Sequence, residues 1–185
     1  MREIASKGQL RWAYLRWAVV TVPFILLLGL ASSRLAPAGA ENAWYMALRK
    51  PDFQPPAIAF PIAWTLLYVL MGLAVAMVIN ARGAPGRGLA LGLFWTQLAL
   101  NLAWSPVFFA AHRVSLALAI IGALIVVVAA TIALFWRVRR VAAVMLIPYL
   151  GWLCFASTLN YQILKLNPDA ESLVSAPAED QIRIR

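Results

Sequence analysis

The sequence WYMALRKPDFQPPAIAFPIAWTLLYVLMG, residues 44–72, joins two different kinds of segment. Its first half is interrupted by prolines and mixes aromatic with charged side chains. Its second half carries no charge and places Trp64 and Tyr68 one helical turn apart. An aromatic side chain buries on the order of 150–250 Å² when it packs, so an exposed loop seldom carries several of them. We therefore expect the first half to fold as a lid, and the second half to be a helix that carries a site beneath the lid.

The composition is that of a membrane protein. Of the 185 residues, 63% are hydrophobic and 12% are charged, whereas soluble domains carry about 25% charged residues. The net charge of +9 does not indicate a nucleic-acid partner, because the basic residues lie in the gaps between apolar runs, as they do in membrane proteins. The single cysteine, Cys154, excludes a disulfide within the chain.

Five uncharged runs are long enough, or nearly long enough, for membrane-spanning helices, which need about 20 residues. They predict an all-α integral membrane fold, a bundle of five transmembrane helices with an amphipathic first loop as its lid. The predicted helices cover approximately residues 17–34, 57–80, 88–110, 114–136 and 141–165. The predicted regions are a basic N-terminal segment (1–16), the membrane domain (17–167) with its lid loop (35–56), and a flexible tail (168–185). The first run is short and also fits a secretory signal peptide.

The distribution of basic residues predicts the orientation in the membrane. The N-terminus and the second and fourth gaps carry nine Lys and Arg residues, and the other side carries five. The positive-inside rule therefore places the N-terminus in the cytoplasm, and the first loop and the C-terminus outside. We expect a bacterial membrane.

Three of the runs have a patterned helical face. In the third run, Gln97, Asn101, Trp104 and Phe108 follow one another at intervals of four, three and four, which is one face of an α-helix. The second and fifth runs repeat this pattern, and the fourth is almost wholly aliphatic. We therefore expect the second, third and fifth helices to line an interior, the fourth to face lipid, and the first to close the ring.

The depth of the polar and aromatic residues leaves two interpretations open. Trp12, Trp17 and Trp136 lie near span ends, where tryptophan usually anchors a helix at the interface. Trp64, Trp104 and Trp152, with polar Gln97, Asn101 and Asn160, lie deeper. These polar groups either bond one helix to another or line a ligand pocket beneath the first loop.

Four blocks of sequence resemble a known family. They are WYMALRKPDFQPP (44–56), FPIAWTLLYVLMG (60–72), QLALNLAWSPVFF (97–109) and PYLGWLCFASTLNYQILKLN (148–167). In this order they resemble the translocator protein family, also called tryptophan-rich sensory or TspO/MBR proteins. The resemblance implies five transmembrane helices, which argues against a signal peptide. It also implies ligands such as protoporphyrin IX, haem, sterols and synthetic isoquinoline or benzodiazepine-type drugs.

The resemblance also assigns residues. The family's ligand cavity corresponds to Tyr45, Trp64, Asn101, Trp104 and Trp152. The helical pattern adds Tyr68 and Asn160 to this predicted cavity. The predicted lid residues are Trp44, Phe53, Pro55 and Pro56. Many relatives have tryptophan where this chain has Phe53. A sterol motif corresponds to Leu159, Tyr161 and Lys165, although a tyrosine and a lysine at a helix end are also common interfacial residues. Gly88 and Gly92 form a small-xxx-small step that could serve a homodimer or a contact within the chain.

Three classes of function compete. The first is a receptor or sensor that binds porphyrin in a tryptophan-lined cavity of the outer half and regulates tetrapyrrole or stress responses. The second is a translocator of porphyrin or sterol, but no ionisable residue lies within a span to couple transport to an ion. The third is an enzyme, for which the only histidine, His112, lies at a helix end. One enzymatic reaction needs no acid–base residue, the light-dependent breakdown of bound porphyrin. In the family this reaction is associated with a pair of tryptophans, to which Trp64 and Trp152 correspond. We expect no required cofactor and no metal site.

Overall fold

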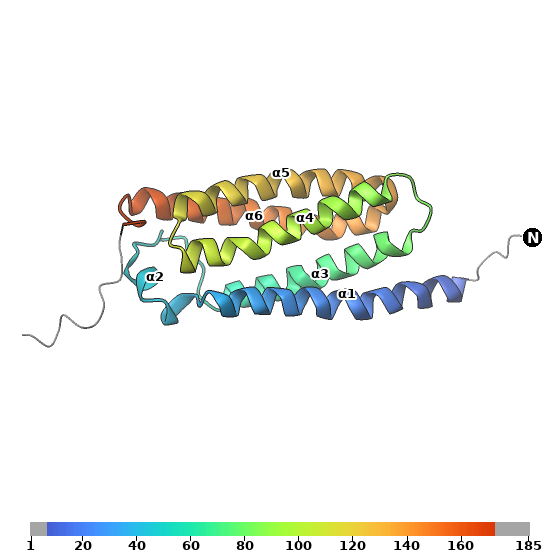
Figure 1. Ribbon diagram of the computed structural model, residues 1–185, viewed down its shortest axis with the longest axis horizontal. Coiled ribbons are helices and arrows are strands. Elements are labelled where there is room, and N and C mark those ends of the chain that lie inside the picture. The colour runs from blue at the N-terminus through green and yellow to red at the C-terminus, as the bar shows by residue number, and fades with distance from the viewer. Residues whose placement is uncertain (1–6, 173–185) are drawn as a thin grey trace, which may run out of the picture.

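The computed structural model describes residues 7–172 and contains helices but no strand in that range. The long helices are α1 (Lys7–Leu35), α3 (Ala59–Asn80), α4 (Arg87–Ser105), α5 (Val114–Val138) and α6 (Arg140–Leu166). Two short helices, η1 (Gly39–Glu41) and α2 (Ala43–Ala47), lie in the first loop, and a π-helical turn, η2 (Pro106–Ala110), continues α4. The long helices run side by side, with α2 at one end of the bundle and the α3–α4 and α5–α6 connections at the other (Figure 1).

Four helices in the described part of the chain are long and apolar enough to cross a membrane: Trp12–Leu35 within α1, and all of α3, α5 and α6. This confirms a helical bundle of membrane-protein character. Helix α4 is less apolar because it begins at Arg87 and buries Gln97 and Asn101 on its inner face.

The predicted helix limits agree with the structure except at the N-terminus. Helix α1 begins at Lys7 rather than near residue 17, because basic residues bound an apolar run without ending a helix. Residues 1–6 of the predicted basic segment and 173–185 of the predicted tail lie outside the described residues. The start of the tail, 168–172, forms turns at the end of α6.

The helices form a ring in the order α1, α3, α6, α5, α4. Helix α3 packs mainly against α1 and α6, while α5 packs between α6 and α4, and α4 returns to α1. Consecutive helices α3 and α4 therefore contact one another less than the short connection between them suggests. Helix α5 buries a single stripe that includes Ala117, Leu124 and Phe135 and exposes its opposite face, as expected of a helix on the lipid side.

Small residues let α1 and α3 approach closely. A Cβ atom added to Gly72 would lie 2.7 Å from the Cα atom of Val22, closer than two carbon atoms can pack. At the same level the Thr21 hydroxyl donates a 2.8 Å hydrogen bond to the Gly72 carbonyl. At this level the backbones of the two helices are therefore in contact, and further along the same pair the Tyr68 ring of α3 packs on Gly29 of α1.

Pro106 explains the change from α4 to the π-helical turn. Proline has no N–H, so it cannot bond the carbonyl four residues earlier. That carbonyl belongs to Leu102, and it accepts a 2.7 Å hydrogen bond from the Ser32 hydroxyl of α1 instead. After the proline the backbone widens, and the Ala111 N–H donates to the Pro106 carbonyl five residues earlier. The widened turn carries Phe108 and Phe109.

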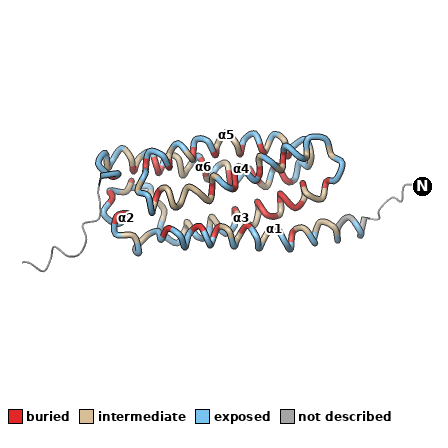
Figure 2. Tube along the Cα trace, viewed as in Figure 1, coloured by how far each residue is buried: buried red, intermediate tan, exposed pale blue. Residues whose placement is uncertain are grey.

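Burial along α3 is uneven. Its buried residues all lie between Leu67 and Val78, whereas residues 59–66 are half-buried or exposed. Figure 2 shows the buried part of α3 on the side away from α2. Helix α3 is therefore closely packed in its second half and less completely packed in the half next to the first loop.

Candidate ligand-binding site

An aromatic group joins α3 to α6 in the half of the bundle next to the first loop. The rings of Trp64 and Trp152 meet edge to face with centroids 6.4 Å apart. Trp152 also contacts Phe60 at 6.0 Å and Phe155 at 5.6 Å, and Trp64 contacts Tyr149 at 6.3 Å. These distances lie within the 4.5–7 Å range of favourable ring pairs.

A groove opens beside this aromatic group. It has a volume of about 490 Å³ and is lined by Pro55 of the first loop, by α3 and by α6: Ala63, Leu66, Leu67, Pro148, Gly151, Trp152 and Phe155. No heavy atom lies within 4 Å of the position that a Cβ atom of Gly151 would take. The lining consists of apolar residues, and the volume falls within the roughly 300–1,000 Å³ of small-molecule sites. The groove can therefore accept a largely apolar molecule.

A chain of hydrogen bonds lies next to the aromatic group and connects three helices. The Tyr68 hydroxyl donates to the Asn101 side-chain oxygen at 2.9 Å, and the Asn101 amide nitrogen donates to the Tyr149 hydroxyl at 3.1 Å. Asn101 therefore bonds one helix to another, with one hydrogen-bond partner at each of its two polar side-chain atoms. Asn101 thereby fixes the rings of Tyr68 and Tyr149.

A second aromatic group lies where α4 and η2 meet the first loop. Trp104 stacks on Phe108 with centroids 5.0 Å apart. Tyr45 contacts Phe109 at 5.3 Å, and burial raises the pKa of the Tyr45 phenol. The predicted site residues are therefore divided: Trp64, Tyr68, Asn101 and Trp152 are linked around Tyr149, whereas Trp104 and Tyr45 belong to the second group.

Hydrogen bonds hold one side of the first loop in place. The Asn42 amide donates to the Phe109 carbonyl at 2.9 Å. Asn167, at the end of α6, accepts from the Arg49 N–H at 2.8 Å and donates to the Arg49 carbonyl at 2.9 Å. The Trp44 indole donates to the Ala170 carbonyl at 2.8 Å. The loop is thus attached both to η2 and to the end of α6.

The predicted lid residues occupy two different environments. Trp44 is only 3% exposed and stacks on His112 with centroids 4.4 Å apart, so it is an anchor of the loop. Phe53 is 49% exposed and contacts Phe155 at 6.5 Å, and Pro55 lines the groove. The exposed Pro56 precedes α3 and accepts the Ala59 N–H through its carbonyl. The part of the loop next to the groove is therefore the segment that contains Phe53 and Pro55.

Several buried polar atoms in the described residues have no hydrogen-bond partner. They are both side-chain polar atoms of Gln97, the indole nitrogen of Trp104 and the side-chain oxygen of Asn160. The amide nitrogen of Asn160 donates to the Val114 carbonyl at 3.3 Å. Since an unpaired polar group in hydrocarbon costs several kcal/mol, the free N–H of Trp104 and the free oxygen of Asn160 can serve a bound molecule or water.

The remaining predicted residues lie away from the groove. Of the sterol motif, Leu159 is buried, whereas Tyr161 and Lys165 are exposed on α6, so the three do not share one environment. Gly88 and Gly92 lie on an exposed face of α4, where an added Cβ atom would meet no heavy atom within 4 Å. That face is open to a partner.

The sequence prediction of the site missed three residues of the aromatic group. Tyr149 contacts both Trp64 and Asn101, and it lies three residues before Trp152 on the patterned face of the fifth run. Phe60 and Phe155 lie four residues before Trp64 and three residues after Trp152. The same spacing rule applied outward from the tryptophans would have found both.

Comparison with known proteins identifies relatives of this chain. The TspO/MBR family model matches residues 19–166. A tryptophan-rich sensory protein of Cereibacter sphaeroides is 42% identical over 126 residues, which cover 68% of this chain and 78% of the relative. The tryptophan-rich protein TspO of Archaeoglobus fulgidus is 38% identical over 149 residues, 80% of this chain and 95% of the relative. The human translocator protein is 38% identical over 131 residues, 70% of this chain and 78% of the relative. The matched residues run from within α1 to the end of α6, and on this ground the chain belongs to the TspO/MBR family.

Proposed function

We propose that this protein is a membrane receptor that binds a flat, largely apolar ring system, a porphyrin such as protoporphyrin IX or haem, in the groove between α3 and α6. The observation that carries the proposal is the wall formed by Trp152, which lines the groove and is supported from the side by Trp64. A planar ligand gains most from such a wall because stacking on an indole adds about 0.5–1.5 kcal/mol to simple burial. Binding would then be reported to the cell as a tetrapyrrole or stress signal.

The proposed topology has five spans, with α4 and η2 together forming the third. Their combined range, Arg87 to Ala110, lies beside the four apolar helices. The buried amides of α4 face the interior, so they need not contact lipid. The positive-inside rule places α2 outside and the α5–α6 turn in the cytoplasm. Single cysteines at exposed Ala47 and Arg137, with Cys154 replaced, test this: labelling of Arg137→Cys but not Ala47→Cys from outside intact cells would reverse the topology.

The first loop, 35–56, is proposed to control access to the groove. The side of the loop that contains Asn42 and Trp44 is attached to η2 and to the segment after α6, whereas exposed Phe53 has an aromatic contact with Phe155, which lines the groove. Opening would therefore involve the segment around Phe53 and Pro55 rather than the whole loop.

Filling the groove tests the site directly. Gly151→Leu places a side chain where no atom now lies, and Gly122→Leu does the same on an open position of α5 away from the groove. Titration of purified protein with protoporphyrin IX, followed by tryptophan quenching and the porphyrin absorption band, should show saturable binding. Gly151→Leu should abolish this binding, and Gly122→Leu should retain it. Equal affinity of the two variants would place the porphyrin elsewhere.

A light-dependent reaction is a second candidate function. Trp64 and Trp152 contact one another, and Trp152 lines the groove, so an indole would lie beside a bound porphyrin. A photoexcited porphyrin can take an electron from such an indole. Illumination of the bound complex should bleach the porphyrin band faster in wild type than in Trp152→Phe, which keeps the aromatic wall. Equal bleaching rates at full occupancy would exclude the reaction.

Translocation, sterol binding and dimerisation remain proposals with narrower support. The groove is lined by exposed residues such as Leu66 and Gly151, which in a bilayer would admit a ligand from the lipid phase and suit a translocator that moves porphyrin or sterol along the membrane. The exposed Gly88 and Gly92 are a plausible homodimer contact. Gly92→Leu should shift a dimer to monomer in detergent without changing porphyrin affinity.

A further inference from the structure

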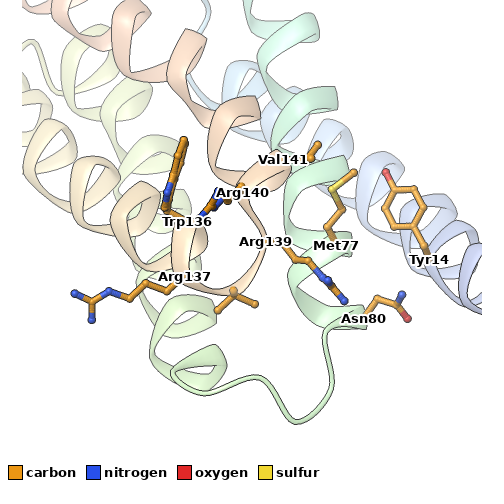
Figure 3. A pocket seen from close by; sticks show the side chains of 9 residues that line it. Tyr14, Met77, Asn80, Trp136, Arg137, Arg139, Arg140 and Val141 are labelled. Atoms are coloured by element: carbon orange, nitrogen blue, oxygen red, sulfur yellow. The ribbon is translucent and has the colours of Figure 1, made fainter. Parts of the chain in front are cut away.

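A second cavity lies at the end of the bundle opposite the first loop. It has a volume of about 560 Å³ and is formed by α1, the end of α3, and the turn between α5 and α6. Figure 3 shows it from close by. Its lining residues are Tyr14, Met77, Asn80, Trp136, Arg137, Val138, Arg139, Arg140 and Val141. None of these residues belongs to the groove beneath the first loop.

The cavity combines three arginines with no acidic residue in its lining. In Figure 3, Arg139 extends toward Asn80 at the end of α3, whereas Arg137 extends away on the other side of the turn. The single ion pair of the described residues, between Arg113 and Glu171, involves none of the three. The cavity therefore carries positive charge that is not neutralised by the described part of the protein.

The helix ends account for only part of this arginine cluster. Arg137 lies in the last turn of α5 and Arg139 is its C-cap, whereas Arg140 is the first residue of α6, whose first turn has no acidic residue. Positive charge is favourable at a helix C-terminus and unfavourable at an N-terminus, because the macrodipole is negative at the former and positive at the latter. By contrast, Arg87 near the same end donates to the Val78 carbonyl at 3.0 Å and the Ile79 carbonyl at 2.8 Å. Arg87 thus caps α3 and Arg139 suits the end of α5, whereas Arg140 is unfavourable for the start of α6.

The rest of the lining is apolar or aromatic. Met77, Val138 and Val141 form part of the wall, and Arg140 lies over the Trp136 ring at 5.9 Å from its centroid. Trp136 is 47% exposed, as is usual for tryptophan at a membrane interface. The cavity therefore offers charge to a polar anion and apolar surface to a chain attached to that anion.

We infer that this cavity binds the phosphate headgroup of an anionic phospholipid from the adjacent leaflet, with Arg139 and Arg140 on the phosphate and Met77 and Val141 against the start of the acyl chains. An amphiphile fits both halves of the lining. Basic pockets between transmembrane helices bind anionic headgroups by this chemistry. The inference is independent of the porphyrin groove, because the two cavities share no residue.

The test compares two short-chain lipids on purified protein in neutral detergent. Dioctanoyl phosphatidylglycerol and dioctanoyl phosphatidylcholine differ in net charge but share the phosphate and the chains. Native mass spectrometry should show preferential binding of phosphatidylglycerol to wild type. The double variant Arg139→Gln, Arg140→Gln should lose roughly 25-fold in affinity for it, at about fivefold for each arginine. The charge-preserving pair Arg139→Lys, Arg140→Lys should keep most of it and remains informative if the glutamine pair does not fold.

A matched control separates this site from general surface charge. Arg82 lies in the α3–α4 turn at the same end, is exposed, and does not line the cavity, so Arg82→Gln should leave the affinity unchanged. An equal loss in Arg82→Gln, or equal binding of the two lipids by wild type, would overturn the inference. Competition by inorganic phosphate at the concentrations at which the lipid binds would show a site for free anions and would also overturn it.

Discussion

Replacing Trp152 by leucine separates a ligand site from a packing cluster. Leucine keeps an apolar side chain but removes the flat wall that the indole presents to the groove. The loss of one stacking contact is worth about 0.5–1.5 kcal/mol. The Trp152 ring also contacts the rings of Phe60 and Trp64, with centroids 6.0 and 6.4 Å apart. Some of the binding free energy that these two rings contribute should therefore be lost with the indole. Since tenfold in affinity is about 1.4 kcal/mol, Trp152→Leu should weaken porphyrin binding roughly tenfold or somewhat more.

The assay is a titration with protoporphyrin IX, with Trp136→Leu and Trp104→Leu as comparisons. Each variant loses one of the eight tryptophans, so the fluorescence changes are comparable, and the porphyrin band gives an independent reading. Trp136 lies at the opposite end of the bundle, so its variant should bind like wild type. Trp104 belongs to the second aromatic group, and its variant should lose less than Trp152→Leu. If Trp152→Leu bound normally while Trp104→Leu did not, the ligand would occupy the interior beside α4 and the groove assignment would be refuted.

Three further predictions concern the scaffold. Gly72→Ala should lower the melting temperature in detergent, because its Cβ atom would lie 2.7 Å from Val22 and overpacking costs about 1–3 kcal/mol. Gly122→Ala, which has open space around it, should not lower the melting temperature. A similar loss in both variants would contradict close packing as the cause. Asn167→Ala removes both hydrogen bonds to Arg49, so amide hydrogen exchange in the first loop should accelerate while helical circular dichroism stays constant. An unchanged exchange rate would mean that this contact does not hold the loop. Hydrogen bonds from the Ser115 hydroxyl and backbone N–H keep the pKa of Glu171 below its ordinary value, so this contact stabilises the folded state at neutral pH and is lost as the pH falls through the lowered pKa. The difference in melting temperature between wild type and Glu171→Gln should therefore shrink from neutral pH to about pH 3, and a difference independent of pH would exclude the carboxylate as its source.

Much of the fold follows from patterns within single segments. Charges bound the apolar runs, so the predicted ends of α3, α5 and α6 lie within about two residues of the observed ones. Helical spacing likewise placed Gln97, Asn101, Trp104 and Phe108 on one face of α4 and η2, where Trp104 is half-buried and the other three are buried. These predictions succeed because helix periodicity and membrane thickness act on each segment separately.

Relations between segments were less accessible, and the first loop shows why. Trp44 and Phe53 are both aromatic residues in a proline-rich stretch, and composition gives them the same predicted role in the lid. Their difference comes from partners far along the chain: Trp44 donates to the Ala170 carbonyl and stacks on His112, while Phe53 contacts Phe155.

The same reasoning applies to Asn101. Its burial could be predicted from spacing, but its role depends on the ring order α1, α3, α6, α5, α4, which brings Tyr68 and Tyr149 to opposite sides of one amide. The Asn101 amide positions the two tyrosines through one acceptor and one donor, and a primary amide also has a second N–H and a second oxygen lone pair. Gln97 and Trp104, about one helical turn before and after Asn101 on the same face, both have buried polar atoms without a hydrogen-bond partner. On α4 the residue that bonds the helices together therefore lies between residues whose polar atoms are unpaired, which is why a sequence pattern alone assigns all three to the same site.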